Sequence, residues 1–239
     1  MFIADHVKRI KLGMTTLSMN VPAEFTSANI EGLIGELVKK NTMPDARIRL
    51  TVFRNEGGFY TPTTNDISFL IESEPIGDQG YVLNQKGLGV DVYTEIKKPM
   101  NKIAHIKTGS SLLYVMAGLA KINLSRDECL LMNENGHIIE SVSANVFSVK
   151  NGVLYTTPVS DGCVDGVMRK QVLDIARQHK ILVFEQSFTT EILTHSNEVF
   201  LTNAIKGIQW IGQFKNAFYT NRTAVFFTEK LNELVQLPC

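Results

Sequence analysis

The sequence predicts a mixed α/β (α+β) fold in two domains, a small α+β domain over residues 1–77 and a larger strand-rich domain over residues 78–239. Helical spacing of apolar residues dominates the start of the chain, and strand-like alternation dominates from Arg47 onward. A run of turn formers, Glu74–Gly80, separates the two parts. The 239 residues can bury a core in one large or two small domains.

The first domain is predicted to contain two helices and two strands. Asp5 is the predicted N-cap of the first helix, and Thr26 or Ser27 that of the second. The segment Arg47–Arg54 alternates as a strand, with Ile67–Ile71 as its partner. The apolar helix positions are Ile3, Val7, Ile10 and Met14 in the first helix and Ile30, Leu33, Ile34, Leu37 and Val38 in the second.

Strands are predicted to dominate the second domain. Its first strand covers Gly89–Ile96, and the pair Asn151-Gly152 suits a type I′ hairpin turn. Asp165 is the predicted cap of a helix that begins at Gly166. The remaining strands are predicted at 129–132, 137–140, 145–149, 153–156, 181–184, 198–202 and 208–214, and the remaining helices at 110–122 and around Ala224, Phe227, Leu231 and Leu234.

Composition excludes several classes of protein. With 24 basic and 24 acidic residues the net charge is zero, so no basic surplus favours nucleic acid. No apolar run approaches the roughly eighteen residues of a membrane span, and the N-terminus lacks the features of a secretory signal. The three cysteines and five histidines show no disulfide or metal spacing. These features predict a cytoplasmic protein with no metal site and no membrane or nucleic-acid partner.

Two residues could support carbanion chemistry. Lys107 ends a strand-like run, Asn101–Lys107, where partial enclosure would lower the pKa of its amine and make it a Schiff-base nucleophile. Glu140 ends a predicted strand and could hold a protonated pyridine nitrogen. By residue type alone, each is more often a solvated surface group.

Two further features suit an anionic ligand. Asp161–Arg169 leads through two glycines into a helix N-terminus, whose free N–H groups attract phosphate. Arg9, Arg49 and Arg54 carry guanidinium groups that suit phosphate or carboxylate. Cys163 is a weaker candidate nucleophile, because no base is placed beside it.

Taken in order, these segments resemble the class IV (fold type IV) pyridoxal-phosphate enzymes, which include branched-chain aminotransferases, D-amino-acid aminotransferases and aminodeoxychorismate lyases. The lysine-to-glutamate spacing, 140 − 107 = 33 residues, is similar to the spacing in that family. The resembling segments are Asp5–Ile10, Arg47–Arg54, Ile106–Thr108, Gly136–Phe147, Thr157-Pro158, Gly162–Arg169 and Glu198–Ala204.

The resemblance implies a role for each candidate residue. Lys107 would form the Schiff base and move the substrate's α-proton, and Glu140 would hold the ring nitrogen. The phosphate ligands would be Arg9, the backbone N–H groups of Val167 and Met168, and the loop at Asn203 and Ala204. Arg49 or Arg54 would bind the substrate carboxylate. The resemblance also implies a pseudo-barrel in the larger domain, the cofactor pyridoxal 5′-phosphate in the cleft between the domains, and a homodimer.

Three departures from the family pattern bear on function. Met168 stands where a threonine is usual, and Asn203-Ala204 is more similar to the lyases than to the aminotransferases. The chain also begins after the family's first strands, so the substrate pocket is expected to be incomplete or built differently. The preferred prediction is transfer of an amino group from a branched-chain type amino acid to a 2-oxo acid. One alternative is a 4-amino-4-deoxychorismate lyase, and another is an inactive or cofactor-binding relative.

Overall fold

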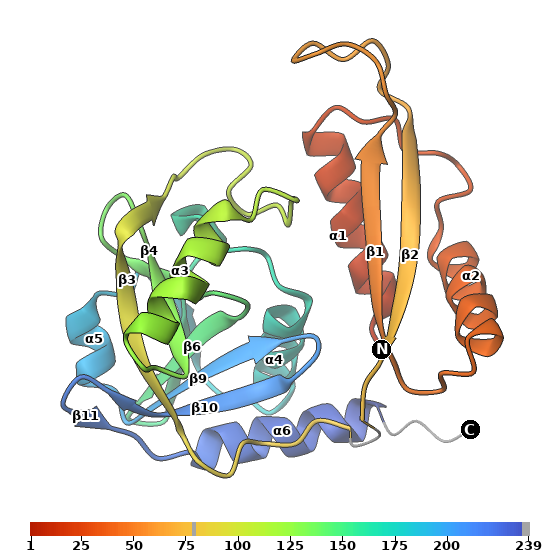
Figure 1. The fold of residues 1–239 in the computed structure, drawn as a ribbon. Coiled ribbons are helices and arrows are strands. Elements are labelled where there is room, and N and C mark those ends of the chain that lie inside the picture. Colours follow the sequence, from red (N-terminus) through yellow and green to blue (C-terminus); the bar gives the residue numbers. More distant parts are fainter. Residues whose placement is uncertain (78–79, 236–239) are drawn as a thin grey trace. The chain divides into compact units, whose positions relative to one another are not determined.

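A computed structural model describes residues 1–77 and 80–235 (Figure 1). The chain forms two compact units, Met1–Gln79 and Gly80–Cys239, here called the small unit and the large unit. The division follows residue 79, whereas the sequence-based boundary follows residue 77. In the described ranges, no helix is both long and apolar enough to cross a bilayer.

The small unit consists of two helices and one β-hairpin. Its elements in chain order are α1 (Ile3–Thr16), α2 (Ser27–Lys40), β1 (Ala46–Arg54) and β2 (Ile67–Pro75), and the two strands pair antiparallel. Thr26 caps α2 as predicted, because its hydroxyl accepts from the N–H of Asn29. The predicted cap of α1 is wrong: the helix begins after Phe2, which has left-handed backbone angles, and Asp5 lies inside the first turn.

One face of the hairpin carries the core of the small unit. Residues of β1 alternate between half-buried and exposed, as the sequence pattern predicts for a strand with one covered face. The half-buried side chains pack on both helices, and the other face presents Arg47 and Arg49 to solvent. The core residues are Val7, Met14, Phe25 and Ile30, with Leu50, Val52 and Ile67 against them.

The large unit is rich in strands. Its strands are β3 (Leu88–Lys98), β4 (Glu128–Asn133), β5 (Ile138–Ser141), β6 (Asn145–Lys150), β7 (Val153–Thr156), β8 (Val183–Glu185), β9 (Glu198–Asn203), β10 (Gly207–Phe214) and β11 (Ala217–Phe218). Its helices are α3 (Leu112–Asn123), α4 (Val167–Gln178), α5 (Thr190–Thr194), α6 (Arg222–Val235) and the short 3-10 turn η1 (Val159–Asp161).

Six of these strands close into a ring, which confirms the predicted pseudo-barrel. The order around the ring is β10, β3, β4, β5, β6 and β9, with β9 pairing back to β10. The pairs that β3 makes are parallel and the other four are antiparallel. The strand residues that fill the interior include Val90, Leu130, Ile138, Val146, Leu201 and Ile211. Closure leaves no free sheet edge along this ring.

Helices cover the outside of the barrel. Helix α3 packs on β3 and β4, whereas α4 and α6 pack on β9 (Figure 1). The α3 side encloses a second apolar cluster that includes Tyr93, Leu131 and Cys163. Asn151 and Gly152 both have positive φ, as the predicted type I′ turn requires.

The predicted strand at Asn101–Lys107 is wrong. Residues 101–106 form turns, with hydrogen bonds from the N–H of Ala104 to the carbonyl of Asn101 and from that of Ile106 to Ile103. Pro99, directly after β3, lacks an N–H group and cannot extend the ladder. The chain therefore approaches Lys107 through a loop.

Candidate functional site

Polar residues on neighbouring strands form a row on the outer face of the barrel. Glu140 on β5 pairs with Asn145 on β6, and Asn145 pairs with Thr202 on β9. Directly paired residues point to the same face of a sheet. The next residues along β6 and β9, Val146 and Leu201, belong to the barrel interior, so this row faces outward. All three of its members are buried.

Glu140 is held by three hydrogen-bond donors from three different segments. Its Oε1 accepts from Lys98 Nζ at 2.6 Å and from the Tyr114 hydroxyl at 2.8 Å. Its Oε2 accepts from the backbone N–H of Val164 at 2.9 Å. The side chains of Glu140 and Lys98 are 4% and 10% exposed, so this is a buried ion pair.

The surroundings keep Tyr114 protonated. Burial, the negative charge of Glu140 and the hydrogen bond to it all raise the pKa of the Tyr114 hydroxyl. Lys98 Nζ also lies 2.8 Å from that hydroxyl and 5.5 Å from the centre of the tyrosine ring. Tyr114 therefore acts on Glu140 as a neutral donor, while Lys98 supplies the charge.

The N-terminus of α4 lies beside this row. The helix begins after Gly166, which has no side chain to cap the first turn, so the predicted cap at Asp165 is wrong. The N–H of Asp165 instead donates to the carbonyl of His105 at 3.1 Å. A Cβ atom on Gly166 would lie 2.0 Å from Asn145 Oδ1, so this close packing requires glycine. Val167 and Met168 are buried in the first turn.

Lys107 lies in the loop between the 101–106 turns and α3, and its side chain is exposed. The sequence predicts that Lys107 is partly enclosed. The structure instead shows an enclosed lysine at Lys98, the last residue of β3. Glu140 is buried and lies on β5, close to where the sequence placed it.

Asn203 ends β9, and Ala204 begins the turn that leads to β10. The side-chain oxygen of Asn203 accepts from the N–H groups of Ile205 and Lys206, which fixes the turn. The carbonyl of Ala204 accepts from the Tyr81 hydroxyl at 3.3 Å. Thr202, at the end of the row that contains Glu140, directly precedes Asn203 on β9. The chain therefore connects this turn to the row.

The three candidate arginines all lie in the small unit and have partners there. Arg49 makes a bidentate pair with Glu72, at 2.7 and 3.0 Å. Arg54 donates to the carbonyl of Leu17 at 2.7 Å and to the side chain of Asn65. Arg9 lies 3.5 Å from His6 Nδ1. Their predicted roles toward cofactor and substrate stay predictions.

The alternative nucleophile, Cys163, has a thiol that stays protonated and is therefore unreactive. Burial raises the pKa of its thiol to about 12, with Glu140 adding to the shift and Arg169 opposing it. A thiol with so high a pKa carries almost no thiolate at neutral pH. In residues 1–77 and 80–235, no group of three His, Cys, Asp or Glu side chains could hold a metal ion.

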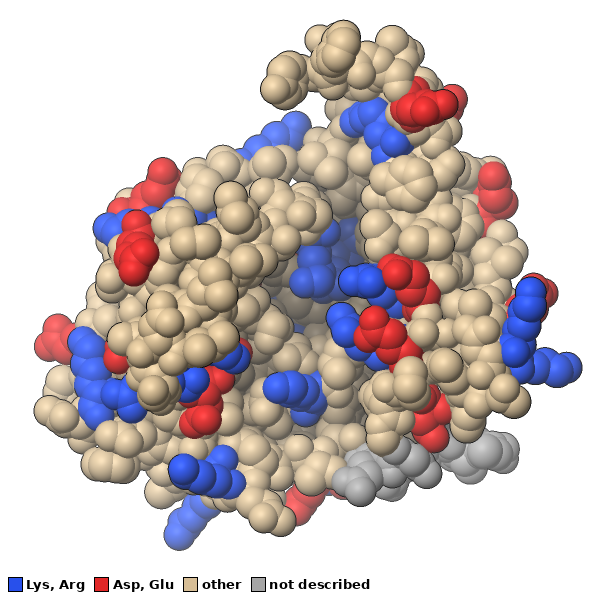
Figure 2. All heavy atoms as spheres, viewed as in Figure 1, with Lys and Arg blue, Asp and Glu red and all other residues tan. Residues whose placement is uncertain are grey.

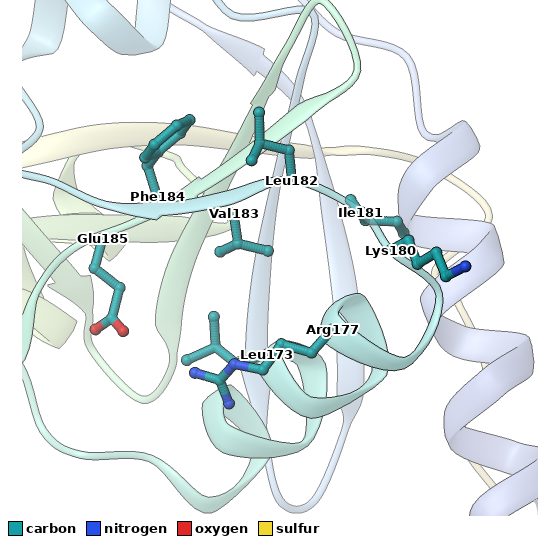
Figure 3. Close-up of a pocket in the computed structure, with 8 residues that line it drawn as sticks. All are labelled: Leu173, Arg177, Lys180, Ile181, Leu182, Val183, Phe184 and Glu185. Carbon is teal, nitrogen blue, oxygen red and sulfur yellow. The ribbon is translucent and has the colours of Figure 1, made fainter.

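A hollow between α4 and β8 is open to solvent and contains none of the predicted site residues (Figure 3). It is lined by Leu173, Arg177 and Lys180–Glu185. On the face shown in Figure 2, basic and acidic side chains are interspersed, in keeping with the zero net charge.

Sequence reasoning missed three residues that the structure places at the site: Lys98, Tyr114 and Asn145. Tyr114 lies in an apolar helix, and its sequence context is that of an ordinary core residue. Lys98 is one of two consecutive lysines at a strand end, and nothing in the sequence distinguishes the buried one. Asn145 could have been found, because it directly follows the turn from Glu140.

Comparison with known proteins agrees with this architecture. The sequence profile of the family described as "Amino-transferase class IV" matches residues 1–214. A protein of Methanocaldococcus jannaschii, named as a branched-chain-amino-acid aminotransferase, is 27% identical over 97% of this chain and 80% of its own length. The branched-chain-amino-acid aminotransferase of Escherichia coli K12 is also 27% identical, over 70% of this chain and 56% of its own length.

Solved structures share the fold. A branched-chain aminotransferase from Thermoproteus uzoniensis has a TM-score of 0.85 at 23% identity, with 98% of this chain and 78% of that chain covered. A structure from Legionella pneumophila, named as a 4-amino-4-deoxychorismate lyase, has a TM-score of 0.85 at 22% identity, with 98% and 84% covered. With the profile spanning most of its length, the chain belongs to the class IV aminotransferase family, whose members are pyridoxal-phosphate-dependent enzymes.

Proposed function

We propose that the chain binds pyridoxal 5′-phosphate and transfers an amino group from a branched-chain type amino acid to a 2-oxo acid. The observation that carries the proposal is the buried carboxylate of Glu140, held by three donors on the outer face of the barrel. The names of the relatives in Methanocaldococcus jannaschii and Escherichia coli support the choice of reaction.

The residues present fit this cofactor. A carboxylate offers about four acceptor positions, and three donors reach Glu140, so one position remains for a pyridinium N–H. The uncapped N-terminus of α4 supplies N–H groups of Val167 and Met168 for a phosphate. Met168 cannot add the hydroxyl that a threonine would supply. We assign the other phosphate contacts to Arg9 and the turn at Asn203 and Ala204.

The choice between two lysines follows from the chemistry of the cofactor. Its aldehyde carbon lies across the ring from the ring nitrogen. The amine of Lys98 is bound to Glu140, at the nitrogen end, so it is poorly placed to hold the aldehyde. We therefore assign the covalent link to Lys107, in the loop before α3.

Each residue then has a definite task. When bound, the cofactor supplies an electron sink for the pair left by the substrate's α-proton. Lys107 removes and returns that proton, and Glu140 holds positive charge at the ring nitrogen. Arg54 or Arg49 binds the substrate carboxylate; for Arg49 this requires displacement of Glu72, its present bidentate partner.

One observation favours a second reaction. The pair Asn203-Ala204 is more similar to aminodeoxychorismate lyases than to aminotransferases, and one solved structure with the same fold carries that name. The alternative proposal is therefore elimination of pyruvate from 4-amino-4-deoxychorismate to leave 4-aminobenzoate.

The cofactor is tested by colour and by chemical labelling. Purified protein mixed with pyridoxal phosphate is expected to turn yellow, lose that absorption on borohydride treatment and carry the label on the peptide that contains Lys107. Lys107→Ala should abolish labelling, and Lys98→Met is the matched control that should retain it. A label on Lys98, or a protein that never becomes yellow, contradicts the proposal.

The reaction is tested on one preparation with two substrates. Leucine plus 2-oxoglutarate is expected to give glutamate. Release of pyruvate from aminodeoxychorismate without an amino acceptor would instead identify the lyase. A yellow protein that turns over neither substrate would identify a relative that binds the cofactor without either activity.

We also propose that the protein is a cytoplasmic homodimer. Helix α3 exposes apolar side chains at successive turns, and contiguous exposed apolar surface marks an interaction site. These side chains are Leu112, Val115, Met116, Leu119 and Ile122. The free thiols of Cys129 and Cys163 suit a reducing compartment. Leu119→Glu is expected to halve the mass measured by light scattering, and an unchanged mass would remove α3 from the interface.

A further inference from the structure

The buried ammonium group of Lys98 is paired with Glu140. The proposed function assigns the carboxylate of Glu140 to the cofactor's ring nitrogen. The Nζ of Lys98 is 2.6 Å from Glu140 Oε1, and its side chain is 10% exposed. Lysine is among the residues that proteins bury least often. An ion pair that contributed only to stability could form at the surface. The burial of Lys98 beside Glu140 therefore points to a functional role.

Two of the groups near Glu140 are neutral, and a third, which is positive, has a carboxylate partner of its own. The Tyr114 hydroxyl from α3 stays protonated and neutral, since burial and Glu140 raise its pKa. The Cys163 thiol, in the loop before α4, also stays neutral, because burial raises its pKa to about 12. Arg169 from α4 is positive, but it pairs with Glu185 at 2.5 Å. Lys98 is thus a cation in direct contact with Glu140.

Two positive charges would compete for one carboxylate when a pyridinium approaches. A like charge within about 4–6 Å disfavours the charged form of a group by one pH unit or more. A protonated ring nitrogen next to Glu140 would meet the ammonium of Lys98 across that carboxylate. The low dielectric of a buried site strengthens this repulsion.

We propose that Lys98 lowers the proton affinity of the cofactor's ring nitrogen by competing with it for Glu140, and thereby limits how strongly the ring withdraws electrons. This inference rests on the proposed function. Lys98 acts through Glu140 and is a positioning residue. A purely structural role for Lys98 would predict weaker cofactor binding on its removal but no change in ring protonation.

The test is a pH titration of the ring nitrogen by nuclear magnetic resonance, with ¹⁵N-labelled pyridoxal phosphate bound to the protein. Lys98→Met and Lys98→Gln are expected to raise the titration midpoint by about one pH unit or more. Lys98→Arg keeps the charge and should titrate close to the wild type. An unchanged or lower midpoint in the two neutral variants overturns the inference.

The wild-type protein provides a second measurement in case the neutral variants fail to fold. Its ring nitrogen is expected to lose its proton within the pH range over which the protein stays folded, since a neighbouring cation lowers the midpoint of this titration. A nitrogen that stays protonated throughout that range overturns the inference without any variant. Failure of the wild type to bind the cofactor would defeat the proposed function as well, whereas a bound cofactor that is indifferent to Lys98 defeats only this inference.

Discussion

The two units bury their strands to different degrees. In the large unit, β6 and β9 are buried on both faces along almost their whole length. In the small unit, no residue of β1 or β2 is fully buried, and half-buried and exposed positions are mixed. A sheet covered on both sides holds a polar side chain in a fixed, dry place, whereas an exposed hairpin leaves its side chains in water. The candidate carboxylate lies in the first setting and the candidate substrate arginines lie in the second.

One ion pair in each unit makes the contrast concrete. Glu140 and Lys98 are 4% and 10% exposed at 2.6 Å, while Glu72 and Arg49 are 38% and 54% exposed at 2.7 Å. The distances are nearly equal, so burial is the main difference between the pairs. Attraction between charges is far stronger where water is excluded, and so is the penalty for leaving one charge alone.

The largest predicted effect is on stability, and it distinguishes the buried ion pair from the exposed one. Glu140→Ala leaves the ammonium of Lys98 buried without its counter-charge, which is expected to lower the free energy of unfolding by about 3–5 kcal/mol. Glu72→Ala, the matched control, exposes Arg49 to water and should leave stability almost unchanged. Urea unfolding of cofactor-free protein measures both. Equal losses in the two variants would mean that burial does not distinguish the pairs.

Sequence patterns were sufficient for the elements but not for the details of the site. The alternation of Arg47–Arg54 and the Asn151-Gly152 turn report local backbone chemistry, and both are confirmed. The burial of Lys98 depends instead on β3, α3 and β5 converging on one point, which no local pattern encodes. The apolar run before Lys107 was misread as a strand for the related reason that short apolar runs fit strands and packed turns alike.

A second prediction compares one glycine from each unit. Gly166→Ala places a methyl group 2.0 Å from the buried Asn145 side chain, and such overpacking is expected to cost about 1–3 kcal/mol. Gly32 lies within α2 with nothing within 4 Å of a Cβ atom, so Gly32→Ala should stabilise the protein by about 0.5–1 kcal/mol.

Thermal or urea unfolding of the two glycine variants shows directly whether each substitution raises or lowers the free energy of unfolding. Because the proposed phosphate contacts lie in the first turn of α4, Gly166→Ala should also weaken pyridoxal phosphate binding, while Gly32→Ala should not. A Gly166→Ala protein with wild-type stability would show that Asn145 can move aside, and the packing at this helix start would then be looser than the structure indicates.

The smallest predicted effect concerns a histidine of the small unit. Burial, the positive charge of Arg9 and the N-terminal amine together lower the pKa of His6 to about 4, with Asp5 opposing them. In the unfolded chain a histidine titrates near pH 6.5, so the unfolded state takes up the proton first as the pH falls. The stability contributed by neutral His6 is therefore complete above about pH 6.5 and is lost as the pH falls toward 4.

The matched variant His6→Gln isolates this contribution, because it removes the titration and leaves other acidic and basic groups in place. Between pH 6.5 and 4.5, the wild type is expected to lose on the order of 1 kcal/mol more stability than the variant, a value reduced from the full shift because His6 is only partly buried. Urea unfolding at both pH values measures the difference. If the wild type and the variant lose equal stability, His6 is as hydrated in the folded protein as in the unfolded chain. The surroundings of His6 and Arg9 on α1 are then more open to water than the structure indicates.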